Sequence, residues 1–207
     1  MKLLYLSLLM FFVSTSFIYS QNEVKIGKQI WMSENLNVDR FRNGDLIPEA
    51  KSSEAWERAN DNKKPAWCYY DFNAENGKKY GKLYNSYAVN DSRGLAPKGF
   101  HVPSDAEWTT LVNVLGGENV AGKKIKSKDG WESGNGDNSS GFNGLPGGFC
   151  TYNGDFSSLG SYGLWWSSTA SGYGGGDGIK RVVSSYSSRV NLDNGQSDGV
   201  SVRCLRD

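Results

Sequence analysis

The segment from Tyr80 to Gly117 constrains the fold more than any other part of this 207-residue sequence. Ser104 followed by Glu107 has the spacing of a capping box, in which each side chain accepts a hydrogen bond from the other residue's backbone N–H. Apolar residues then recur at the i, i+3, i+4, i+7 spacing of one helix face: Trp108, Leu111, Val112 and Leu115. Gly116-Gly117 suits a left-handed helix C-cap. The segment therefore predicts a helix over residues 105–115 and contains little reactive chemistry.

The first twenty residues are typical of a secretory signal peptide. Lys2 precedes an apolar run from Leu3 to about Ile18, and Ser20 supplies a small residue for cleavage. A retained membrane anchor is the less favoured interpretation, because the run is shorter than the roughly 20 apolar residues that span a bilayer. We therefore expect residues 1–20 to be removed and residues 21–207 to form a single domain in the periplasm, at the cell surface or in the medium.

The charge balance of the expected mature chain excludes simple electrostatic partners. Removing Lys2 leaves 22 of the 23 basic residues against 22 acidic ones, so no net field attracts nucleic acid or an anionic membrane. A lysine cluster follows the predicted helix, at Lys123, Lys124, Lys126 and Lys128. No aromatic residues interleave with these lysines, so we interpret the cluster as a solvated turn and expect no nucleic-acid partner.

Strand and turn patterns occupy the first half of the mature chain. Residues 24–31 predict an opening hairpin, and residues 53–59 predict a short helix with Trp56 facing inward. Residues 65–72 resemble a strand that ends at a predicted turn, Asn76-Gly77. The aromatic segment from Tyr80 to Val89 fits either a strand or a bent helical turn.

Glycine dominates the second half. Residues 134–199 contain 16 of the 26 glycines, which predicts short strands, such as 164–169 and 180–183, between long loops. Residues 200–205 alternate as a final strand, with Val200, Val202 and Cys204 on one face. A terminal strand beside the first hairpin would hold the chain ends. The overall prediction is an α+β fold.

Three cysteines enter an oxidising compartment if the chain is exported. One disulfide and one remaining thiol is the simplest arrangement of Cys68, Cys150 and Cys204. We favour a Cys68–Cys204 bridge because both residues lie in strand-like settings. In the chain-entropy model, closing so long a loop would contribute roughly 4–5 kcal/mol of stability.

The chain resembles the Fibrobacter succinogenes major paralogous domain family over essentially the whole mature sequence. The motifs that carry the resemblance are, in chain order, VKIG (24–27), QIWM (29–32), ENLN (34–37), WCYY (67–70), YGKLYN (80–85), GFHVPS (99–104) with EW (107–108), LPGG (145–148), WWSST (165–169) and VRC (202–204).

This resemblance implies a C-type-lectin-like fold, as in formylglycine-generating enzymes: short twisted antiparallel sheets, one or two flanking helices and long irregular loops. Phe100 stands where the family usually has tryptophan, and Cys150 where it usually has another residue, which makes Cys150 the expected free thiol. The family has no established catalytic or ligand residues to transfer.

The sequence contains few residues that could bind a metal ion or a cofactor. His101 is the only histidine, and we expect a structural role for it, because Ser104 nearby is already engaged as a helix cap. One histidine and three scattered cysteines do not supply a zinc site. Calcium candidates are Asp137-Asn138 and Asp193-Asn194 with Asp198, but ordinary turn chemistry explains both stretches. The glycine-rich stretch 172–178 lacks the lysine and hydroxyl residue of a phosphate loop. We expect no metal and no cofactor.

Adjacent Trp165 and Trp166 are better explained as core residues on opposite faces of a strand than as a sugar-stacking pair. The sequence instead favours a non-catalytic binding or surface-interaction module whose ligand is a glycan or a protein. Its expected contact residues lie in Gly/Ser/Tyr/Asn-rich loops that resemble an adaptable paratope: Tyr152, Tyr162, Tyr173, Tyr186, Arg189 and Asn191. Two alternatives remain, an enzyme that uses Cys150 and Cys204, and a structural component of a surface assembly.

Overall fold

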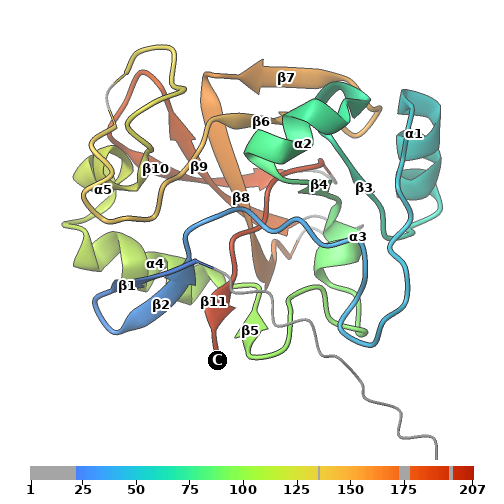
Figure 1. Ribbon diagram of the computed structural model, residues 1–207, viewed down its shortest axis with the longest axis horizontal. Helices are drawn as coiled ribbons and strands as arrows, with labels where there is room; N and C mark the ends of the chain where they lie inside the picture. Colours follow the sequence, from blue (N-terminus) through green and yellow to red (C-terminus); the bar gives the residue numbers. More distant parts are fainter. Residues whose placement is uncertain (1–21, 135, 173–177, 196–197) are drawn as a thin grey trace, which may run out of the picture.

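The computed structural model describes residues 22–134, 136–172, 178–195 and 198–207 (Figure 1). The described residues form an α+β fold in which five α-helices surround several short antiparallel sheets. The sequence predicted this class, but its expectation of one or two flanking helices was too low. No helix in the described part of the chain combines the length and apolar character needed to cross a membrane.

The two ends of the described chain meet in one sheet. Strands β1 (Glu23–Ile26) and β2 (Gln29–Met32) form the predicted opening hairpin. Strand β11 (Leu205–Arg206) pairs with β2 on one side and with β5 (Phe100–His101) on the other. Figure 1 shows these strands together beside the C-terminus. The prediction that a final strand lies next to the first hairpin is confirmed, but this strand covers Leu205–Arg206 and not the expected residues 200–205.

Helix α4 (Asp105–Val114) is the helix predicted from the capping box. Both hydrogen bonds of the box are present between Ser104 and Glu107. At the other end, the amide of Gly117 donates to the carbonyl of Val112 and that of Gly116 to Asn113, which is a Schellman motif. The predicted apolar face is buried, and a second helix, α5 (Glu118–Ile125), follows directly.

The region between strand β2 and helix α4 contains three more helices. Helix α1 (Ser53–Asp61) buries Trp56 as predicted. A 3-10 turn (Tyr70–Phe72), α2 (Ala74–Tyr80) and α3 (Ser86–Val89) follow, interleaved with strands β3 (Trp67–Cys68) and β4 (Leu83–Tyr84). Helices α2 and α3 are each capped by an asparagine side chain, Asn73 and Asn85, and are too short to show an apolar period.

The predicted turn at Asn76-Gly77 is wrong, because both residues lie inside α2. Asn73 accepts a hydrogen bond from the amide of Glu75 and so starts the helix. Gly77 packs beneath Tyr69, and a Cβ at this position would lie 2.1 Å from that ring. This glycine therefore permits a close side-chain contact rather than a turn.

The second half contains the longest strands, contrary to the expectation of long loops between short strands. Strands β8 (Tyr162–Ala170), β9 (Gly178–Ser184) and β10 (Val190–Gly195) form one antiparallel sheet in the order β10-β9-β8, and β6 (Gly147–Cys150) pairs with β7 (Phe156–Leu159). Glycine was misleading because two of these glycines make room for indoles. A Cβ at Gly163 would lie 2.6 Å from Trp165, and one at Gly178 would lie 2.7 Å from Trp166.

The β8–β9 pair separates two apolar clusters. Trp166, Leu164 and Val182 face a cluster that also contains Val200, Val202 and Cys204, as expected for the alternating final segment. Trp165 and Val183 face the other cluster, with Trp108 of α4. Both adjacent tryptophans are buried, which confirms the prediction that they serve opposite cores.

Two polar predictions need correction. The expected Cys68–Cys204 bridge is absent, since all three cysteines are free and buried. Cys68 and Cys150 share one cluster, whereas Cys204 lies in another. The lysine cluster is not wholly solvated either: Lys126 is fully buried, and its ammonium donates to the carbonyls of Ser184 and Ser187 at 2.9 and 2.8 Å.

Candidate functional site

A pocket of about 400 Å³ opens on the face of the β8–β9–β10 sheet that carries Trp166. This volume lies within the range of small-molecule sites. Apolar and aromatic side chains line it together with a small polar group: Phe149, Ser158, Tyr162, Leu164, Lys180, Val182, Asn191, Asp193 and Asp198.

The strand register explains why these residues meet. Leu164 of β8 pairs with Val182 of β9, which pairs with Asn191 of β10. One step further along the sheet, Lys180 of β9 pairs with Asp193 of β10. Because side chains on one face of a sheet recur at every second residue, three strands contribute alternate residues to a single surface. The site is thus built mainly on regular strands, and Asp198, which lies outside any strand, completes its polar side.

Buried residues of the apolar core form the pocket floor. Leu164 and Val182 are buried members of the core cluster beneath it. Phe149 of β6 and Tyr162 of β8 are only partly buried and pack against the edge of the same cluster. Two aromatic side chains with some remaining exposure therefore stand at the pocket wall, where a flat apolar ligand surface could contact them.

One cation and two carboxylates form the polar side of the pocket. The Lys180 side chain is 1% exposed, and its ammonium lies 2.5 Å from Asp198 Oδ2 and 3.2 Å from Asp193 Oδ2. It also lies 5.6 Å from the centroid of the Trp166 ring. Asp193 is 50% exposed, so it can exchange water for a ligand donor. Carboxylates exceed ammonium groups here by one, which favours hydrogen-bond donors and disfavours anions.

Ser158 at the pocket wall has an unusual backbone conformation. Its φ of 66° lies in the left-handed region although it is a non-glycine residue inside strand β7. Its hydroxyl lies 3.1 Å from that of Ser157. Such conformations cost on the order of 1–3 kcal/mol and cluster at functional sites.

The opposite side of β9 is closed. The Arg181 guanidinium donates to the Asp105 carboxylate from Nε at 2.9 Å and from Nη2 at 2.5 Å. Nη2 also donates to the hydroxyl of Thr109 at 2.8 Å. Asp105 and Thr109 belong to α4, so Arg181 joins the sheet to the start of that helix and lines neither described pocket.

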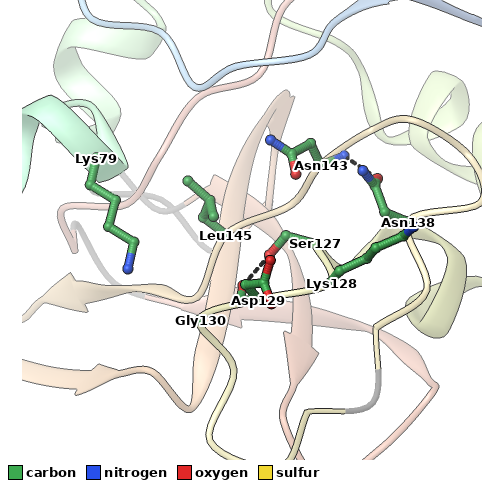
Figure 2. Close-up of a pocket in the computed structure, with 8 residues that line it drawn as sticks. All are labelled: Lys79, Ser127, Lys128, Asp129, Gly130, Asn138, Asn143 and Leu145. Carbon is green, nitrogen blue, oxygen red and sulfur yellow. Dashed lines mark hydrogen bonds between the residues drawn. The ribbon is translucent and has the colours of Figure 1, made fainter.

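A second pocket, of about 300 Å³, lies between α2 and the loop after α5. Figure 2 shows Lys79 extending from α2 toward this loop. Two polar side chains of the loop already have partners, since Asn138 Oδ1 accepts from the backbone amide of Asn143 at 2.8 Å and the Ser127 hydroxyl donates to the Asp129 carbonyl at 2.7 Å. No aromatic side chain lines it. Because it lacks an aromatic wall and two of its polar side chains are engaged within the loop, the sheet pocket is the better candidate.

The calcium candidates have other partners in the structure. Asp193 and Asp198 converge on the Lys180 ammonium, which occupies the place a cation would need. Asp137 accepts a hydrogen bond from the Ser139 amide at 2.9 Å, as in an ordinary Asx turn. Within the described ranges, no group of three or more His, Cys, Asp or Glu residues is placed to hold a metal ion.

His101 bridges two acidic groups. Its Nδ1 lies 2.9 Å from Asp207 Oδ1, and its Nε2 lies 3.0 Å from Glu107 Oε1. Partial burial lowers the pKa of His101, but the hydrogen bonds from Asp207 and Glu107 outweigh this effect, and the net pKa is raised. Since Glu107 also caps α4 through Ser104, the histidine ties β5, the helix start and the chain end together. These contacts are those expected of a structural residue.

The sheet pocket contains two of the six expected contact residues, Tyr162 and Asn191. Tyr152 instead donates to Asp61 at 2.6 Å, Tyr186 is 67% exposed and donates to Glu132, and Arg189 pairs with Glu118. None of these three lines the pocket, and Tyr173 lies outside the described residues.

Sequence reasoning missed other pocket residues, among them Phe149 and Lys180, and it considered Asp193 and Asp198 only as calcium candidates. The missed signal was alternation, because every second residue of 162–164, 180–182 and 191–193 faces the site. Cys150 and Cys204 line neither described pocket and lie in separate buried clusters. The geometry on which the thiol-enzyme alternative depended, two neighbouring thiols that open into a cavity, is not found for this pair.

The sequence model of the Fibrobacter succinogenes major domain matches residues 24–206. No curated protein and no solved structure matches the chain.

Proposed function

The chain belongs to the Fibrobacter succinogenes major domain family, and we propose that it is an exported, non-catalytic carbohydrate-binding module of C-type-lectin-like fold. The observation that carries the proposal is the pocket on the β8–β9–β10 sheet, where partly exposed aromatic rings face a compact polar group. Support for the fold comes from the pairing of β11 with β2 near the chain ends and from the long sheet that presents the pocket.

The pocket chemistry suits a sugar better than a protein segment. A pyranose has an apolar C–H face that can pack on Tyr162 or Phe149, and hydroxyl groups that both donate and accept hydrogen bonds. Asp193 offers acceptors only, whereas the Asn191 amide offers both a donor and an acceptor. A volume of about 400 Å³ holds a small ligand, whereas stable protein–protein interfaces cover far broader surfaces.

Charge sets the expected selectivity. Asp193 is half exposed in the pocket, so an acidic sugar would place its own carboxylate beside the Asp193 carboxylate. We therefore expect neutral or amino-bearing saccharides to bind and uronic acids to be rejected. Export, which the signal-peptide pattern of residues 1–20 predicts, would place the module where polysaccharides of the cell surface or surroundings are accessible.

Calorimetric titration of the mature protein with neutral, amino-bearing and acidic oligosaccharides tests this proposal. We expect Tyr162→Ala and Asn191→Ala to weaken binding of a neutral oligosaccharide at least about tenfold, which corresponds to about 1.4 kcal/mol. Matched controls are Tyr186→Ala and Asn194→Ala, which change the same residue types outside the pocket and should leave affinity unchanged.

Two results would reject the proposal. One is the absence of binding to every saccharide class at millimolar concentration. The other is binding that responds equally to the pocket variants and to their matched controls. Capture of a specific protein through the same residues would instead establish a protein-binding module and contradict the assignment to sugars.

A further inference from the structure

Two of the three cysteines are neighbours in the structure although 82 positions separate them in the sequence. Cys68 lies on β3 and Cys150 on β6. Residues 199 and 200 connect these regions, because Val200 bridges to Tyr84 of β4 and Gly199 bridges to Cys150. The fold thus draws β3 and β6 together around one apolar cluster that holds both Cys68 and Cys150, and the neighbouring Cys150 contributes to the raised pKa of the Cys68 thiol.

The surroundings of this thiol pair are apolar and closed. Both side chains are fully buried, and the cluster consists otherwise of aromatic and aliphatic residues: Ala50, Trp56, Ala66, Tyr70 and Leu83. Burial, followed by the interaction with Cys150, raises the pKa of the Cys68 thiol. A thiol of this kind is a poor nucleophile in the folded protein, so the pair is not built for catalysis.

We propose that Cys68 and Cys150 are joined by a disulfide bond in the exported protein, while Cys204 remains a buried free thiol. The inference depends on export but not on the carbohydrate proposal. Adjacent thiols in an oxidising compartment form disulfides when their geometry allows it. Cys204 has no such neighbour in its cluster, where it is the only cysteine among the buried residues described.

The oxidation balances by thiol–disulfide exchange. The two cysteines give up two protons and two electrons as their S–S bond forms, and the disulfide of an exchange partner is reduced to two thiols. The partner would be a thiol–disulfide oxidoreductase of the export compartment, or oxidised glutathione in vitro. Because both sulfurs are inaccessible once the cluster has closed, the exchange takes place while the chain is still folding.

Mass spectrometry of the exported wild-type protein tests the bond directly. The protein is denatured without reductant, alkylated and weighed, and then digested without reduction. We expect one alkylated cysteine, Cys204, and a cross-linked peptide pair that contains Cys68 and Cys150. After reduction, all three cysteines should be alkylated. Three alkylated cysteines before reduction, or a cross-link that includes Cys204, would overturn the proposal.

Thermal unfolding of variants provides a second measurement. Reductant should lower the Tm of the wild-type protein by about 10 °C and that of Cys204→Ala by a similar amount. Cys150→Ala should show no dependence on reductant. If Cys150→Ala retains the dependence, or if Cys204→Ala alone loses it, the assignment is wrong. Should Cys150→Ala fail to fold, the mass analysis of the wild-type protein still decides.

Discussion

Strand β9 places two adjacent cations in opposite environments. Arg181 points toward α4, where Asp105 and Thr109 accept hydrogen bonds from its Nε and Nη2. Lys180 points the other way, into a pocket where one of its two carboxylate partners is half exposed. Both cations are buried, so burial alone does not separate a structural charge from a functional one. The difference lies in what remains on the far side of the ion pair, a helix for Arg181 and solvent for Lys180.

The same contrast extends to the whole β8–β9 sheet. One face is covered by α4 and by the aromatic cluster around Trp108 and Trp165. Core residues cover only part of the other face, where Tyr162 and Phe149 remain partly exposed. A closed face stabilises the fold, whereas an open face with paired charges and aromatic rings can bind a ligand. Variants on each face of the sheet test that division.

The largest effect is expected on the closed side. Arg181→Met should lower the free energy of unfolding by about 3 kcal/mol, because it leaves the partly buried Asp105 without its charge partner. Oligosaccharide affinity should not change. Urea denaturation and calorimetry on the same variant measure the two quantities. An unchanged free energy of unfolding, or a loss of affinity in the folded variant, would contradict the assignment of Arg181 to a purely stabilising face.

On the open side, the expected effect is on binding. Lys180→Met should weaken binding of a neutral oligosaccharide about tenfold or more, since Asp193 and Asp198 lose the cation that holds both carboxylates in place. Calorimetric titration under conditions in which the variant remains folded measures the change. Arg181→Met is the matched control, and an equal loss of affinity in both variants would contradict a pocket-specific role for Lys180.

A smaller effect is expected at the start of α4. Ser104→Ala removes the side-chain acceptor for the Glu107 amide and should lower the free energy of unfolding by about 1 kcal/mol. Ser133→Ala, at an exposed serine, is the control and should change stability little. Comparable urea midpoints for both variants would show that the capping box contributes nothing measurable to the closed face.

The smallest effect concerns His101 and depends on pH. Because its pKa is raised in the folded protein, folding stabilises the protonated imidazolium relative to the unfolded chain. The added stability is present below the unfolded pKa of about 6.5 and is lost as pH rises through the folded pKa. Exposure of the side chain limits it to less than about 1 kcal/mol.

Urea denaturation of the wild-type protein and of His101→Gln between pH 5.5 and 8.5 measures this contribution. The stability difference between them should shrink as pH rises. A difference that stays constant or grows over that range would show that the histidine charge does not stabilise the contact with Asp207 and Glu107.

Local patterns made the closed half of the molecule predictable. The capping box, the apolar period of α4 and the opening hairpin each depend on residues close in sequence, and each is confirmed. The alternation of Val200, Val202 and Cys204 also identified their shared core. Helices α2 and α3 escaped prediction because asparagine caps and tertiary packing, not periodicity, define them.

The pocket was harder to predict because it depends on register between distant strands. Tyr162 and Asn191 were expected as loop residues, yet they lie on strands β8 and β10. Glycines that make room for Trp165 and Trp166 gave the impression of loops. The proximity of Cys150 to Cys68 could not be predicted from local sequence, since it depends on bridges made by the distant residues 199 and 200.

Methyl NMR during an oligosaccharide titration tests the division between the two faces most directly. Val182 and Val183 are neighbours on β9, but Val182 lines the pocket and Val183 lies in the closed cluster. We predict that the methyl signals of Val182 and Leu164 shift with saturable dependence on a neutral oligosaccharide, while those of Val183 and Val190 do not. Saturable shifts at Val183 and Val190, or at Leu145 in the second pocket, with Val182 unchanged, would contradict the assignment of the open face as the binding site.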